Sequence, residues 1–430
     1  MKHVLRTLEK VGNIELFYDL IFAYIVAVVT GLLHGHGAFF TFGHYLTFSV
    51  AALVAIQVWF NTTFLVNRYG DGSLGDSACM FTNMFCLYFM AEALGHPGGV
   101  ELWMFNLSWA AIIVNLIVHW RLKVRRYVNV DEADRRIIDS SVRILAAQLA
   151  ILVLSFALPF HVAQHLTAAA LVVGMAFWAT AFLHDLKPTN FDHLAERCCL
   201  LVIVVFGEMV AGIANYVHAI EFSLAQVGLS LLVFTLVVGL FLVYDYEYEH
   251  LLDHGLVSDG TGLMLVHSLV VFILQNLAAA LEYLSDFGGH MDPQAQDKVV
   301  FLMVGLVLYL IATLLVSVYN RPIFQLSGSF VLGRLLVCLL IVVVSVASGF
   351  NPVISLVADT VLVYATYLHQ RVLFTRRTRL VELSEHLGLS REELSVLGYS
   401  SETRQGRERI ARLMEEGPHM IEGDEGPHGE

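Results

Sequence analysis

Charged residues are scarce in this chain. Asp, Glu, Lys and Arg make up only 15% of its 430 residues, whereas 57% are hydrophobic, and this balance excludes an ordinary soluble domain. The apolar runs lack the alternating pattern of membrane-barrel strands, so they indicate helices. The sequence therefore predicts an all-α, polytopic helical membrane protein that has the lipid bilayer as a partner.

Metal motifs and disulfide patterns are lacking as well. The five cysteines fall inside the expected membrane spans, and no two of them have the spacing of a zinc motif (Cys79, Cys86, Cys198, Cys199 and Cys338). We therefore expect no disulfide framework, no bound metal and no cofactor. Nothing indicates nucleic-acid binding, because topology and anionic lipid explain the basic stretch 121–136. The sequence leaves undecided whether the protein forms a homo-oligomer.

Long apolar runs dominate what is present. Windows of about twenty apolar residues predict twelve membrane spans. The spans lie near residues 11–33, 41–66, 76–94, 100–119, 138–160, 163–183, 194–217, 222–244, 259–282, 298–319, 327–349 and 352–369. The short loops after the third and ninth spans both end in Gly-Gly, which favours two halves of six spans, an arrangement common in transporters.

The character of the chain changes after the last span. Residues 1–370 are expected to form the membrane bundle and residues 371–416 a charged helical tail, in which Ser390 to Glu393 is a capping box. The acidic, Gly- and Pro-rich residues 417–430 are expected to be disordered.

The distribution of cations predicts the orientation in the membrane. Lys and Arg collect on the cytoplasmic side of membrane proteins, and an inside N-terminus leaves only Lys298 on the outer side. We therefore expect both termini in the cytoplasm. Histidines recur near the short outer loops, which indicates either a proton sensor or weak metal site, or a neutral polar residue at an interface without cations (His34, His36, His44, His96, His161, His165, His218 and His290).

The first span carries two acids. Glu15 and Asp19 are four residues apart and therefore lie on one face of a helix. Ionisable groups in a span are expensive unless they face protein or water, so this helix is expected inside the bundle. The alternative for Glu15 is that it reaches back to the membrane surface.

The seventh span carries Glu196, Arg197 and Glu208. Eleven residues make about three helical turns, so Arg197 and Glu208 return to nearly the same face. Gly207 and Ala211 form a small-xxx-small pair, which predicts that a neighbouring helix approaches closely there.

Depth in the membrane suggests two pairs. Asp19 and Arg334 both lie roughly 12 Å from the cytoplasmic edge, and Glu208 and Asp359 both lie roughly 10 Å from the outer edge. We predict that Asp19 can form an ion pair with Arg334, and that the two outer carboxylates can share a proton or cation.

The two marked spans resemble the bacterial low temperature requirement protein A family. The resemblance lies in Glu15-Leu-Phe-Tyr-Asp-Leu20, His193-Leu-Ala-Glu-Arg197 and Phe206-Gly-Glu208, and it extends over residues 10–370. The family usually has Phe at Tyr18 and an apolar or glycine pair at Cys198-Cys199. The resemblance implies a multi-pass protein of the bacterial inner (plasma) membrane and names no substrate.

These observations favour a secondary transporter or a proton- or ion-coupled carrier, with an unknown small ion or molecule as substrate. Glu15, Asp19, Glu208 and Asp359 are expected to form the ion path, and Glu196, Arg197 and Arg334 a gate or ion pair.

The alternative is a membrane sensor or scaffold that signals through the tail. A membrane enzyme is a third reading, with a metal site made from His184, Asp185, Asp192, His193 and Glu196, but that cluster lacks a catalytic spacing. We expect no catalytic residue and no enzyme activity.

Overall fold

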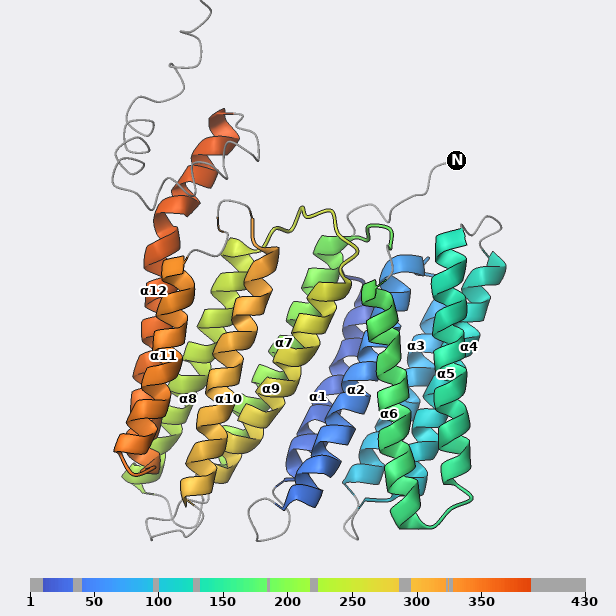
Figure 1. The fold of residues 1–430 in the computed structure, drawn as a ribbon, viewed down its shortest axis with the longest axis horizontal. Coiled ribbons are helices and arrows are strands. Elements are labelled where there is room, and N and C mark those ends of the chain that lie inside the picture. The colour runs from blue at the N-terminus through green and yellow to red at the C-terminus, as the bar shows by residue number, and fades with distance from the viewer. Residues whose placement is uncertain are drawn as a thin grey trace, which may run out of the picture.

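In the part of the chain that the structure describes, twelve long α-helices run side by side (Figure 1). The computed structural model describes residues 11–33, 41–95, 100–126, 132–183, 186–216, 223–285, 295–321, 324 and 328–387. The helices are α1 (Asn13–Gly31), α2 (Phe42–Tyr69), α3 (Leu74–Leu94), α4 (Leu102–Arg126), α5 (Glu132–Ser155), α6 (Phe160–Leu183), α7 (Phe191–Gly212), α8 (Leu224–Tyr246), α9 (Thr261–Ser285), α10 (Ala295–Val316), α11 (Gly328–Ala347) and α12 (Pro352–Leu387). The predicted all-α membrane fold is confirmed.

Eleven of these helices are long and apolar enough to cross a membrane. The exception is α7, in which Asp192, Glu196, Arg197 and Glu208 interrupt the apolar sequence. This helix nevertheless stands in the middle of the row (Figure 1), and its Arg197 side chain is completely buried. A position inside the bundle therefore explains how α7 can carry Arg197.

The two sets of six helices pack in the same order. In the first half α1 packs on α3, α3 on α4, α4 on α5, α5 on α6, and α2 on α6. In the second half α7 packs on α9, α9 on α10, α10 on α11, α11 on α12, and α8 on α12. Six crossings return a chain to the same side, so the halves are related by rotation about an axis along the membrane normal. This repetition supports the predicted division into two halves.

The halves meet mainly where α1 packs against α7 and α2 against α9. Both α1 and α7 begin at the end of the bundle where α12 finishes, which we call the terminal face (Figure 1). Asn190 caps α7, since its side chain accepts a hydrogen bond from the backbone N–H of His193 at 3.2 Å. This cap fixes the first turn of α7, the helix that packs against α1.

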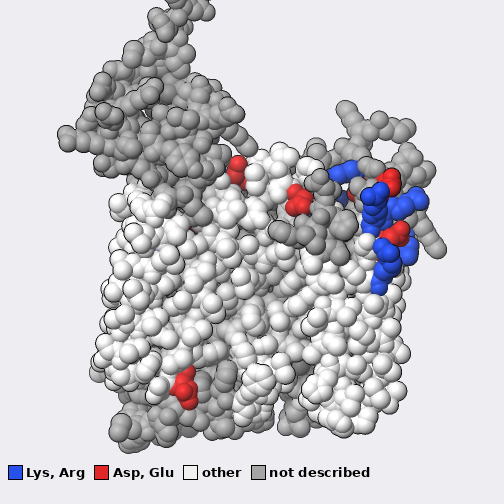
Figure 2. Space-filling model, in the orientation of Figure 1, with Lys and Arg blue, Asp and Glu red and all other residues white. Residues whose placement is uncertain are grey.

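Basic side chains mark the terminal face. In Figure 2 the visible Lys and Arg residues gather at that end of the molecule, and a broad band without them covers the rest of this side. Arg121 and Arg136 belong to the exposed basic residues of α4 and α5. A band without Lys or Arg beside a basic end is the pattern of a membrane protein.

The last helix passes through the predicted boundary at residue 370. It continues to Leu387, and Phe374 is buried against Phe324 and Phe330. The predicted capping box at Ser390 to Glu393 and the acidic end 417–430 lie outside the described residues.

Candidate functional site

A buried ion pair joins the two halves. The Arg197 Nη2 atom lies 2.6 Å from Asp19 Oδ1, and its Nε donates to Oδ2 at 3.2 Å. The Trp59 indole N–H donates to the same Asp19 Oδ1 at 3.0 Å. Arg197 is 0% exposed and Asp19 3%. The contact is thus a two-pronged, charge-assisted pair shielded from solvent.

A second pair lies one turn nearer the terminal face. His193 Nε2 is 2.8 Å from Glu15 Oε2, and His193 Nδ1 is 2.9 Å from Asn67 Oδ1. The Asn67 amide nitrogen in turn donates to Thr189 Oγ1 at 2.7 Å. With the amide in this orientation, Nδ1 carries a hydrogen and donates it to Asn67. The His193 ring therefore bridges Glu15 on α1 and Asn67 on α2.

The two pairs occupy equivalent positions in the two halves. Glu15 and His193 are the third residues of α1 and α7, and Asp19 and Arg197 are the seventh. Each pair joins residues 178 apart along the chain. The four-residue spacing of two acids on α1 therefore meets the same spacing of two bases on α7.

Polar groups continue from this site into the first half. Tyr18 OH donates to Thr62 Oγ1 at 3.0 Å, and Asn83 Nδ2 is 3.3 Å from the same oxygen. Asn115 Nδ2 donates to Asn83 Oδ1 at 2.8 Å. The sequence difference at Tyr18 thus supplies a hydrogen bond between α1 and α2.

Glu196 and Arg197, which were predicted to form a gate, bind different partners. Arg197 binds Asp19, whereas Glu196 Oε2 accepts a hydrogen bond from the Val11 backbone N–H at 3.3 Å. Both residues therefore connect α7 with the beginning of α1.

The predicted Asp19–Arg334 pair is wrong. Arg334 on α11 donates to Thr313 Oγ1 at 2.9 Å and to Gln370 Oε1 at 3.2 Å. The Gln370 amide nitrogen then donates to Glu247 Oε2 at 2.5 Å, so a buried acid and a buried base are bridged within the second half. Equal depth did not identify the partner, because α1 packs against α7 and Arg197 reaches Asp19 there.

Glu247 was missed by the sequence reasoning. It follows α8 at the start of a single π-helical turn, Glu247–Leu251, beyond the predicted span, and it also accepts a hydrogen bond from Asn320 at 2.7 Å. An isolated π turn often marks a functional position. The available signal was an acid in the sequence YDYEYEH at a span end.

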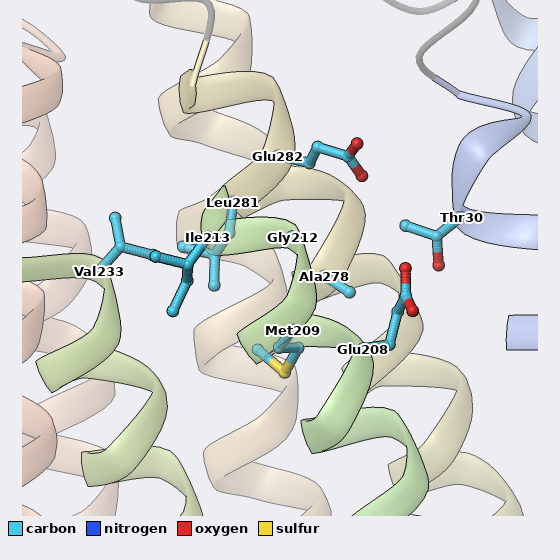
Figure 3. A pocket seen from close by; sticks show the side chains of 9 residues that line it. All are labelled: Thr30, Glu208, Met209, Gly212, Ile213, Val233, Ala278, Leu281 and Glu282. Carbon is cyan, nitrogen blue, oxygen red and sulfur yellow. The ribbon is translucent and has the colours of Figure 1, made fainter. Parts of the chain in front are cut away.

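The predicted pairing of Glu208 with Asp359 is also wrong. Glu208 lines a small pocket with Thr30 and Glu282, and Figure 3 shows its carboxyl group pointing toward the side where these two residues lie. Asp359 belongs to α12, which packs on α8, α10 and α11, and its Oδ1 atom has no hydrogen-bond partner among the described residues. The two carboxyl groups therefore have different surroundings.

Gly207 does not lie at a close helix crossing. A methyl group added at Gly207 would meet no atom within 4 Å. Such close approach occurs instead at Gly174 of α6, where the added carbon would lie 2.4 Å from both Gln57 and Gln148. The small-residue spacing on α7 therefore predicted a close helix crossing on the wrong helix.

The proposed metal cluster at the start of α7 is not assembled in the described part of the chain. Asp192 pairs with His254 at 2.7 Å, and His193 and Glu196 have the partners given above. His184 and Asp185 lie outside the described residues. No group of three His, Cys, Asp or Glu side chains suited to a metal occurs among the residues that the structure describes.

The fold and the interface between its halves define a polytopic helical membrane protein built from two six-helix units. A family model, described as "Bacterial low temperature requirement A protein (LtrA)", matches residues 10–365. The chain belongs to this family. A search of curated proteins finds no match.

Proposed function

We propose that this protein is a secondary carrier of the bacterial inner membrane, driven by protons or monovalent cations, with both termini in the cytoplasm. The observation that carries the proposal is the double pair of Glu15 with His193 and Asp19 with Arg197 between two repeated halves. Ionisable groups held inside a membrane bundle are functional candidates because they are expensive to bury. No catalytic role is proposed for them.

Proton exchange at Glu15 and His193 is the coupling step of this proposal. A carboxylate facing a neutral imidazole attracts α1 to α7 less strongly than a carboxylate facing an imidazolium does. A change of one proton therefore alters the free energy that holds the halves together. In a carrier this difference biases a rocking motion between them.

Contacts at the terminal face support a closed gate on that side. Arg68 at the end of α2 donates to the backbone oxygen of Lys187 at 2.9 Å and to that of Asp259 at 2.5 Å. The first oxygen belongs to the connection between the halves, and the second to the loop before α9. Arg68 thus ties the first half to the second beside the ion pairs.

The test is flux in proteoliposomes that contain the purified protein. A pH gradient, a Na⁺ gradient and a K⁺ gradient are imposed in turn, with an internal pH dye and radioactive Na⁺ and Rb⁺ as readouts. We expect flux in the wild type and at least a tenfold loss in Glu15→Gln, Asp19→Asn and Glu208→Gln.

The matched control is Asp139→Asn, which removes the partner of Arg121 in an exposed pair at the same face. This variant should keep wild-type flux. Absence of flux under every gradient, or normal flux in both Glu15→Gln and Asp19→Asn, would overturn the carrier.

The alternative function is a sensor with a cytoplasmic output. It is favoured by one observation, the continuation of α12 as a single helix from the bundle to Leu387. Ending the chain after Leu387 separates the two functions. A carrier keeps its flux without residues 388–430, whereas a sensor keeps the folded bundle and loses its signal.

A further inference from the structure

The first half contains a cavity of about 730 Å³ at the face opposite the terminal face. Its walls are the last turns of α1 and α3 and the first turns of α2, α4 and α6. Cavities of 300–1,000 Å³ are typical of small-molecule sites. This volume is therefore suited to a molecule larger than a hydrated metal ion.

The described lining residues include no Asp, Glu, Lys or Arg. Aliphatic side chains and the rings of Phe105 and Phe160 form most of the wall, and the polar atoms come from His44, Thr47, Gln164, His165 and Thr167. The part of the chain that the structure describes offers no hydrogen bond to the side chains of Gln164 or His165. Both side chains are exposed, and both line the cavity.

We propose that this cavity binds a small, uncharged, amphipathic molecule. A charged ligand would lose its hydration without meeting an opposite charge, which is strongly unfavourable in an apolar site. An imidazole and an amide can both donate and accept hydrogen bonds, so His165 and Gln164 suit a neutral polar group. The apolar wall holds the remainder of the ligand.

Hydrogen bonds hold the floor of the cavity, and α2 is common to the cavity and the ion pairs. Thr167 donates to Asn106 Oδ1 at 3.0 Å, and Asn106 Nδ2 donates to Ser155 Oγ at 3.0 Å. Cavity residues Val50 and Ala51 lie on α2, the helix whose Trp59 donates to Asp19. The identification of this ligand with the transported substrate rests on the proposed function. The binding of the ligand in the cavity does not.

Two neighbouring alanines of α6 provide a matched test. Ala168 lines the cavity, whereas Ala169 is exposed and is not part of the lining. Ala168→Cys and Ala169→Cys proteins in vesicles are treated with N-ethylmaleimide, which reacts with the thiolate form in water. We expect labelling of Ala168→Cys to be at least ten times faster. The unsubstituted protein, with buried or half-buried cysteines, gives the background rate.

Protection by three related probes tests the ligand class. Benzyl alcohol, benzoate and benzylammonium share one ring and differ in charge. At equal concentrations we expect benzyl alcohol alone to slow labelling of Ala168→Cys at least threefold, and His165→Leu in the same background to remove this protection.

Equal labelling of the two alanine positions, or equal effects of the three probes, would overturn the proposal. Thr47→Cys repeats the test from α2 if Ala168→Cys does not fold. Because labelling requires no transport, failure of this proposal is distinguishable from failure of the carrier.

Discussion

At the scale of single residues, the contact between the halves combines repetition with opposite charge. Helices at equivalent positions of two repeated units bring equivalent residues together at the axis between them. If the units were identical there, Asp19 would face another acid, and two buried like charges repel. The chain avoids this repulsion because α7 carries His193 and Arg197 where α1 carries Glu15 and Asp19.

Exchange of the charges tests this arrangement. Asp19→Arg and Arg197→Asp alone each bring like charges together in the interior and should destabilise the protein by more than about 3 kcal/mol. The double variant restores an opposite pair and should recover at least half of that loss. Thermal unfolding in detergent measures all three proteins.

Recovery will be incomplete because the Trp59 N–H, which donates to Asp19, would then face a guanidinium. The exposed pair of Arg121 and Asp139 is the control, and its loss should cost less than about 1 kcal/mol. A double variant no more stable than the worse single variant would contradict the arrangement.

Packing at single glycines gives a second prediction. In Gly174→Ala the added methyl must displace Gln57 and Gln148, which are hydrogen-bonded to each other at 2.7 Å. We expect a loss of about 1–2 kcal/mol. Gly207→Ala meets open space and should unfold at the wild-type temperature or slightly above it. Equal unfolding temperatures of the two variants would show that the packing at Gly174 is loose.

At the scale of helices, length and hydropathy determined most of the fold. The first span was predicted at 11–33 and α1 is Asn13–Gly31, because a membrane span needs about twenty apolar residues. Length and hydropathy did not identify which helices pack side by side. Depth along a helix is one coordinate, so Arg334 and Arg197 were both acceptable partners for Asp19 until helix packing chose Arg197. The shared four-residue spacing of Glu15/Asp19 and His193/Arg197 was the signal that could have identified the pairs.

The end of α12 gives a prediction about the tail. Ending the chain at Gln370 removes Phe374, which is buried against Phe324 and Phe330 and closes a small hydrophobic cluster. That truncation should lower the unfolding temperature and the yield of protein, since loss of a buried Phe costs about 3–5 kcal/mol. Ending the chain after Leu387 keeps the cluster and should leave the unfolding temperature unchanged. A stable protein ending at Gln370 would place the end of the bundle before Phe374.

At the scale of the whole molecule, α7 determines which sides the two ends of the chain occupy. By apolarity alone only eleven of the described helices qualify as spans, and an odd number would leave the start of α1 and the end of α12 on opposite sides. Twelve crossings place both ends on one side, where the exposed arginines of α4 and α5 also lie (Figure 2). Arg197, one of the charges that make α7 less apolar, is the one that Asp19 satisfies inside the bundle.

Two fusions isolate the crossing made by α7. Alkaline phosphatase is active only outside the cytoplasm, so we fuse it after residue 189, just before α7, and after residue 222, just before α8. Both chains contain Glu15 and Asp19, so Arg197 meets its partner in the longer one. We expect low activity after residue 189 and high activity after residue 222. Low activity at both positions would leave α7 on one side of the membrane. If the longer fusion is active as expected, adding Asp19→Leu to it should lower that activity, because Arg197 would enter the membrane without a counter-charge.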